Sequence, residues 1–119
     1  MENGLLTRKS KVLDLNQGKL FLSDSLFVEK ALIFKHLNAE TIVFGNVNSG
    51  PFLSINIPRA PYLALWSWPF ENRHFICIEP WWGLPDMVET SEKFINKKGI
   101  EILDVGQRKS GNYSISILN

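Results

Sequence analysis

Short runs of β-favouring residues, separated by proline, glycine and asparagine, are the feature that most restricts what this chain can fold into. The clearest run covers residues 53–57, where leucine and isoleucine alternate with serine and asparagine, the pattern of a strand with one buried face. Pro58 ends this run, and Pro69 ends a second run at residues 62–68. Runs this short and this closely spaced predict an all-β fold, and we expect an antiparallel β-sandwich.

The same pattern predicts further strands over residues 19–22, 41–44, 74–79, 100–105 and 113–117. The sequence Asn-Val-Asn-Ser-Gly-Pro at 46–51 is a strong turn signal, so strands 41–44 and 53–57 are expected to form a hairpin. Residues 26–33 remain ambiguous between helix and strand because the apolar run is short. Residues 89–93 are expected to form a loop or a short helix, and turns are expected at 16–18, 71–73, 97–99 and 106–111.

The composition is that of a packed globular domain. Of the 119 residues, 45% are hydrophobic and 21% are charged, and we expect one domain over residues 1–119. The formal net charge is +1, so the composition does not favour nucleic acid as a partner. An oligonucleotide-binding barrel is the second candidate fold, and it is disfavoured because no basic groove accompanies the aromatic residues.

Neither a membrane nor a metal is expected as a partner. The N-terminus lacks the basic flank and apolar stretch of a signal peptide, and the most apolar window, residues 60–70, is shorter than the roughly 20 residues that span a bilayer. Cys77 is the single cysteine, so no intrachain disulfide can form, which fits a cytoplasmic location. One cysteine and two histidines far apart in sequence give no zinc spacing, and no cofactor is expected.

The stretch Phe-Ile-Cys-Ile-Glu-Pro-Trp-Trp at residues 75–82 carries the candidate site. On a strand, Glu79 shares a face with Phe75 and Cys77, and the strand is predicted to end or bulge at Pro80 because proline has no amide to donate. A carboxylate beside apolar and aromatic surface tends to have a raised pKa, which suits a general base. The alternative is a solvated Glu79 or one paired with a cation. Cys77 is expected to be a small core residue with an inert thiol.

Two segments then carry a resemblance to a known family. Residues 57–67 and 75–83 resemble the aldose 1-epimerase (galactose mutarotase) family, most closely its bacterial mutarotase-related branch. Smaller agreements are Ala31–Phe34, Pro85-Asp86, Glu92-Lys93 and the final alternating segment 113–117. The resemblance covers nearly all of this chain but only the C-terminal part of the family's longer domain.

The resemblance implies a galactose mutarotase-like supersandwich that binds a monosaccharide in an open cleft. The family interconverts the α and β anomers of aldoses, using a glutamate base on the C1 hydroxyl and a histidine that protonates the ring oxygen. Glu79 stands at the position of that glutamate. Trp81 and Trp82 are the candidate sugar-binding residues, because aromatic rings stack on the C–H faces of sugars. We expect one of them to face the cleft and the other to pack inward, while Trp66 is expected in the core and Asp86 in a turn cap.

The sequence departs from the family in two respects. The family's two site histidines belong to the N-terminal half, and neither His36 nor His74 matches them. Both are expected to be ordinary surface or strand-end histidines. Related proteins commonly carry an aspartate in the stretch before Ala31, where this chain has Lys30 with Glu29 beside it. The enzymatic hypothesis therefore has alternatives, a non-catalytic carbohydrate-binding β-sandwich or an inactive remnant.

A partial sandwich is expected to expose apolar faces and open strand edges. Three outcomes are left open: poor folding, a homodimer, or pairing with a separate chain that carries the missing N-terminal half.

Overall fold

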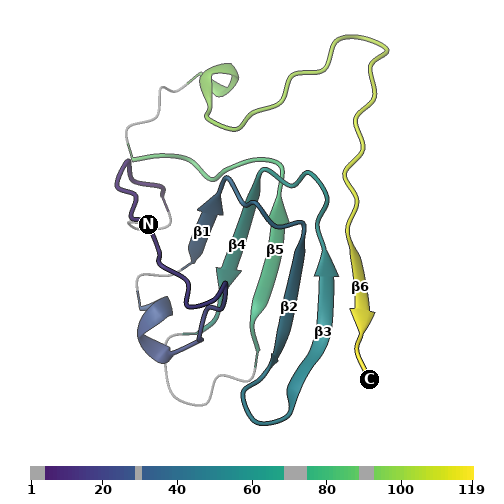
Figure 1. Ribbon diagram of the computed structural model, residues 1–119. Helices are drawn as coiled ribbons and strands as arrows, with labels where there is room; N and C mark the ends of the chain where they lie inside the picture. Colours follow the sequence, from purple (N-terminus) through teal and green to yellow (C-terminus); the bar gives the residue numbers. More distant parts are fainter. Residues whose placement is uncertain (1–4, 29–30, 69–74, 89–92) are drawn as a thin grey trace.

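The computed structural model describes residues 5–28, 31–68, 75–88 and 93–119, and these residues form two three-stranded sheets (Figure 1). One sheet has the strand order β1-β4-β5, and the other has the order β2-β3-β6, with every neighbouring pair antiparallel. The strands are β1 (Leu32–Lys35), β2 (Thr41–Asn46), β3 (Gly50–Asn56), β4 (Tyr62–Trp66), β5 (Cys77–Trp81) and β6 (Ser114–Ile117). The fold class predicted from the sequence, an all-β antiparallel sandwich, is confirmed.

The predicted hairpin forms between β2 and β3. Asn46 pairs with Gly50 at its tip, and the Asn48 amide donates a hydrogen bond to Asn46 Oδ1 at 2.8 Å. Gly50 has a φ of +82°, a conformation that glycine adopts without steric cost. The register shifts between Phe44 and Gly45, where Phe52 of β3 is the extra residue of a bulge. The turn residues therefore fix the register of β2 against β3.

The main hydrophobic core lies where the two sheets meet. Its buried members are Phe27, Ile55, Ile57, Leu63 and Leu65. Ile55 and Ile57 come from β3 and the residue after it, whereas Leu63 and Leu65 come from β4. Burial of each such side chain contributes about 1.5–3 kcal/mol, so the odd-numbered residues of these strands hold the sheets together.

Three segments differ from their sequence-based predictions. Residues 19–22 form no strand, and Lys19 only bridges back to Asn16 in a short turn. Residues 100–105 form no strand either, because no neighbouring strand in the described residues pairs with this exposed segment. The ambiguous segment at 26–33 contains the end of a 3₁₀ turn, η1 (Asp24–Phe27), and the start of β1. The turn expected at 71–73 lies outside the described residues, as does most of the segment 89–93, after which η2 (Phe94–Asn96) follows.

The prediction that the strand ends or bulges at Pro80 was wrong. β5 continues to Trp81, and Pro80 pairs with Leu63 of β4. β5 is an edge strand, and alternate residues of an edge strand turn their amide away from the ladder, so a residue without an N–H is accommodated there. This extra length brings Trp81 into the sheet.

The molecule is less compact than a typical domain of its length. Its radius of gyration is 16.2 Å, whereas about 13–14 Å is expected for 119 residues. The segment that runs outside the sheets before β6 accounts for part of this difference (Figure 1). Residues 101–117 are exposed throughout. In the described part of the chain, no helix is long and apolar enough to cross a membrane.

Candidate functional site

The register of β5 places Cys77, Glu79 and Trp81 on one face of the β1-β4-β5 sheet. Each lies opposite a residue of β4: Trp66, Ala64 and Tyr62, respectively. This face is opposite the one that carries Leu63 and Leu65 into the main core, because successive side chains of a strand point to opposite faces. The sequence correctly predicted that Glu79 and Cys77 share a face.

A tryptophan holds the Glu79 carboxylate in place. Trp81 Nε1–H donates a hydrogen bond to Glu79 Oε2 at 3.0 Å, and both side chains are half-buried. Ala64, directly across the ladder, is fully buried, so the carboxylate lies beside a shielded, small residue. In the described part of the chain no lysine, arginine or histidine forms an ion pair with Glu79. The carboxylate is therefore oriented by a neutral donor and keeps acceptor capacity for a further hydroxyl.

Cys77 lies beside Glu79 on the same face and is half-buried. Desolvation raises the pKa of the Cys77 thiol, and the negative charge of Glu79 and a hydrogen bond to its carboxylate raise this pKa further. A thiol with a raised pKa is protonated at neutral pH and reacts poorly as a nucleophile. Cys77 is thus chemically quiet, although it lies on the Glu79 face and not in the main core.

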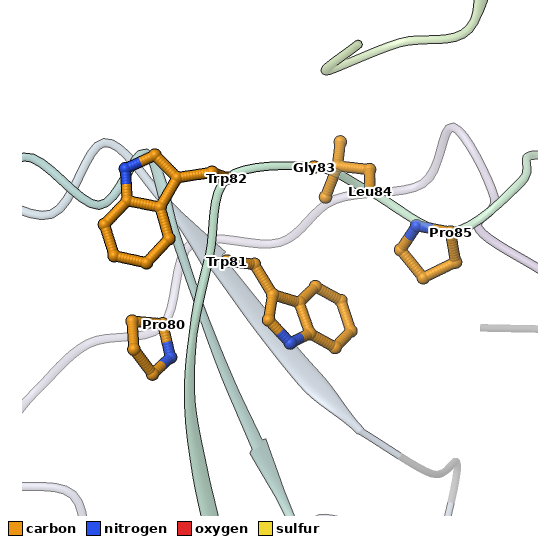
Figure 2. A pocket seen from close by; sticks show the side chains of 6 residues that line it. All are labelled: Pro80, Trp81, Trp82, Gly83, Leu84 and Pro85. Carbon is orange, nitrogen blue, oxygen red and sulfur yellow. The ribbon is translucent and has the colours of Figure 1, made fainter. Parts of the chain in front are cut away.

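An open hollow of about 360 Å³ lies beyond the end of β5. Figure 2 shows its lining, which consists of Pro80, Trp81, Trp82, Gly83, Leu84 and Pro85. This lining is mainly apolar and aromatic, and the volume is at the lower end of the range for small-molecule sites. Glu79 does not line the hollow itself. Trp81 connects the two, since its indole lines the hollow and its N–H binds the Glu79 carboxylate.

The indole rings of Trp81 and Trp82 point to opposite sides of the chain (Figure 2). Trp82 packs over the backbone of Gly111, where an added Cβ would come within 3.1 Å of the ring. Together with Glu101, Leu103 and Lys109 it lines a second hollow of about 500 Å³, and Glu101 and Lys109 form an ion pair there. Trp82 therefore ties the end of β5 to the C-terminal segment.

Of the remaining residues singled out from the sequence, the structure describes His36, Trp66 and Asp86. His36 follows β1, is exposed and has a φ of +55°. Lys30 and His74 lie outside the described residues. Trp66, expected in the core, is half-buried on the Glu79 face and packs against Phe75 and Trp68. Asp86, expected to cap a turn, forms an ion pair with Lys97 at 2.9 Å.

Sequence reasoning missed the contributions of neighbouring elements to this region. Tyr62 and Ala64 flank the site because β4 pairs with β5, and this pairing could have been proposed from two consecutive strands separated by a turn. The contacts of Glu101, Lys109 and Gly111 around Trp82 had no local signal, since they depend on where the long C-terminal excursion returns. In the described residues no group of three or more histidine, cysteine, aspartate or glutamate side chains lies close enough to hold a metal ion.

Comparison with known proteins identifies two relatives in Lactococcus lactis subsp. lactis, "Protein LacX, plasmid" and "Protein LacX, chromosomal". Each is 32% identical to this chain over 120 residues. The similarity covers 99% of this chain and 40% of each relative, so the chain spans about two fifths of the length of the curated relatives it matches. No family model matches the chain, and no solved structure matches it.

Proposed function

We propose that this chain provides the sugar-binding wall and the catalytic base of an aldose 1-epimerase-like site, with Glu79 as the base. The observation that carries the proposal is the Glu79 carboxylate, held by Trp81 Nε1–H at 3.0 Å beside an open aromatic hollow. A carboxylate oriented by one fixed donor can accept a proton or a hydrogen bond from a sugar hydroxyl. An indole next to it offers a flat surface for the C–H face of a pyranose.

In the proposed reaction Glu79 accepts the proton of the anomeric hydroxyl while an acid protonates the ring oxygen. The C1–O5 bond then breaks to give the open-chain aldehyde, rotation about C1–C2 exchanges the faces, and reversal of both proton transfers closes the ring as the other anomer. Atoms and charges balance without a metal or a redox partner. The site therefore needs one base and one acid on either side of C1.

The acid has to come from outside the described residues. His36 is the one histidine among them, and it lies beyond the end of β1, two strands and thus roughly 10 Å across the sheet from β5. The LacX relatives are consistent with a carbohydrate-related role. The match covers 40% of each relative, and we propose that the acid belongs to a region corresponding to the other part of their length.

A carbohydrate-binding β-sandwich without turnover is the second candidate. It is favoured by the lack of a histidine beside Glu79 in the described part of the chain. It needs only the carboxylate and the exposed edge of the aromatic hollow, both of which lie on or next to β5.

Anomer exchange tests the enzymatic proposal. Freshly dissolved α-glucose or α-galactose is followed by polarimetry or saturation-transfer NMR with the wild-type chain, Glu79→Gln and the control Glu40→Gln, which changes an exposed carboxylate before β2. Sugar binding is measured in parallel by tryptophan fluorescence. Acceleration that Glu79→Gln removes and Glu40→Gln retains supports the enzyme. Saturable binding without acceleration is expected both of the binding module and of a site whose acid this chain does not carry, and the absence of both binding and acceleration contradicts the two proposals.

A further inference from the structure

Of the four edge strands in the two sheets, β6 alone lacks a feature that discourages pairing with another strand. β1 ends in Lys35, β5 contains Pro80, and β2 contains Gly45, a residue that weakens a strand. Charges, prolines and bulges are the usual means by which proteins protect their sheet edges. β6 has the sequence Ser-Ile-Ser-Ile, and residues 113–119 contain no charged side chain, proline or glycine.

The apolar face of β6 is also left exposed. Ile115 and Ile117 pair with Ile55 and Leu53 of β3, which places them on the face of the sheet that carries the core. Nevertheless Ile115 is 58% exposed and Ile117 is 81% exposed. Tyr113, which precedes β6, is 59% exposed. The apolar face that carries the core therefore extends onto β6, where it is exposed.

Backbone hydrogen-bonding groups point outward along the same edge. The Leu118 N–H donates to the Phe52 carbonyl at 3.0 Å, so the backbone groups of Leu118 face β3. In an antiparallel strand the direction alternates, which turns the Ser116 N–H toward β3 and the N–H and C=O groups of Ile115 and Ile117 away from it. β6 lies at the outer side of its sheet, next to the C-terminus (Figure 1).

We propose that β6 pairs antiparallel with β6 of a second copy of this chain, and that the pairing is symmetric about a two-fold axis. With Ile115 opposite Ile115 of the second copy, Tyr113 lies opposite Ile117 of that copy, and all these side chains share the core face. The result is one six-stranded sheet in the order β2-β3-β6-β6-β3-β2. A net charge of +1 per chain provides little repulsion between copies. This interface is independent of the proposed sugar site, which lies on the other sheet.

The test compares Ile117→Lys with the matched control Val47→Lys. Val47 lies in the β2–β3 turn of the same sheet and is 82% exposed, about the same as Ile117, so both variants make the same change in charge at equally exposed positions. The association state is measured by sedimentation equilibrium of the full chain. We expect a dimer of twice 13.6 kDa for the wild type and for Val47→Lys, and a dissociation constant about tenfold higher or more for Ile117→Lys, because two cross-strand pairs are lost.

Amide hydrogen exchange gives a second, residue-level readout. The amides of Ile115 and Ile117 are expected to be protected in the dimer and to exchange freely in Ile117→Lys. The Ser116 amide should stay protected in both, which shows that β6 still pairs with β3 and that the variant is folded. The proposal is overturned if the wild type is monomeric at high concentration, or if a dimer persists in Ile117→Lys with Ile115 and Ile117 unprotected.

Discussion

At the scale of single residues, the side chains of β5 depend on one another. Trp81 orients the Glu79 carboxylate, and the pKa of the Cys77 thiol is raised by burial and, further, by Glu79. All three point to the same face because they are two residues apart on a strand. A substitution at Glu79 is therefore expected to change the pKa of Cys77. This change tests the local geometry without a sugar ligand.

Glu79→Gln is expected to lower the pKa of Cys77. The substitution removes the negative charge that disfavours the thiolate, while burial, the larger cause of the upward shift, remains. Because the folded-state pKa of this acid is raised, its contribution to stability is present at neutral pH and is lost as the pH rises through the thiol range. This loss should be smaller in Glu79→Gln.

Thiolate absorbance at 240 nm as a function of pH measures this pKa, with Glu40→Gln as the control. An unchanged titration midpoint in Glu79→Gln would show that the two side chains do not interact in solution.

At the scale of the strands, alternation and turn chemistry were sufficient to predict β2, β3 and β4, to within a few residues at their ends. The hairpin is locally determined, since its turn and both strands lie within residues 41–56. The false strand at 100–105 shows the limit of this reasoning. Its residues have the right composition, yet a strand also needs a partner, and sequence pattern does not provide one. Pro80 is the opposite case, a residue that predicts a strand end yet lies within a strand. The sheet accommodates this proline because β5 is an edge strand.

Gly45→Ala is expected to destabilise the hairpin. An added Cβ would lie 2.6 Å from the Gly50 carbonyl oxygen and 2.6 Å from Pro51 Cα, both backbone atoms that cannot move independently of the turn. Overpacking of this kind costs about 1–3 kcal/mol. Gly83→Ala is the control, since its nearest neighbour, the Gly99 oxygen, is 3.9 Å away.

Urea denaturation of the two variants measures the free energy of unfolding. Equal midpoints for Gly45→Ala and Gly83→Ala would contradict the close approach of β2 and β3 at the bulge.

At the scale of the whole molecule, stability is unevenly distributed. The buried core joins β3 and β4, whereas the segment from 101 to 113 is exposed along its length. Trp82 packs against Gly111 of this segment, the Asp86–Lys97 ion pair lies before it, and the Glu101–Lys109 ion pair lies within it. The site candidates Glu79, Trp81 and Trp82 could be named from sequence. The role of Trp82 as an anchor for this distant segment could not, because it depends on the fold as a whole.

Limited trypsin digestion is expected to cut after Arg108 or Lys109 before it cuts after Lys35. All three side chains are exposed, but Lys35 lies in the paired strand β1, whereas the other two lie in a segment without regular structure. Cleavage after Lys35 needs local opening of the sheet, whereas cleavage after Arg108 or Lys109 needs little opening. Mass spectrometry of the first products identifies the cuts, and early cleavage after Lys35 would show that the sheet is less stable than its packing indicates.

The register of β5 against β4 has a consequence for folding fidelity. If β5 slipped by one residue along β4, every side chain would change faces, and Glu79 would enter the apolar space between the sheets while Ile78 left it. Placing a carboxylate there without a partner is strongly unfavourable. The candidate catalytic residue thus also penalises the misaligned sheet, so a neutral substitution at this position is expected to weaken the discrimination between correct and shifted pairing even where the native contacts stay intact.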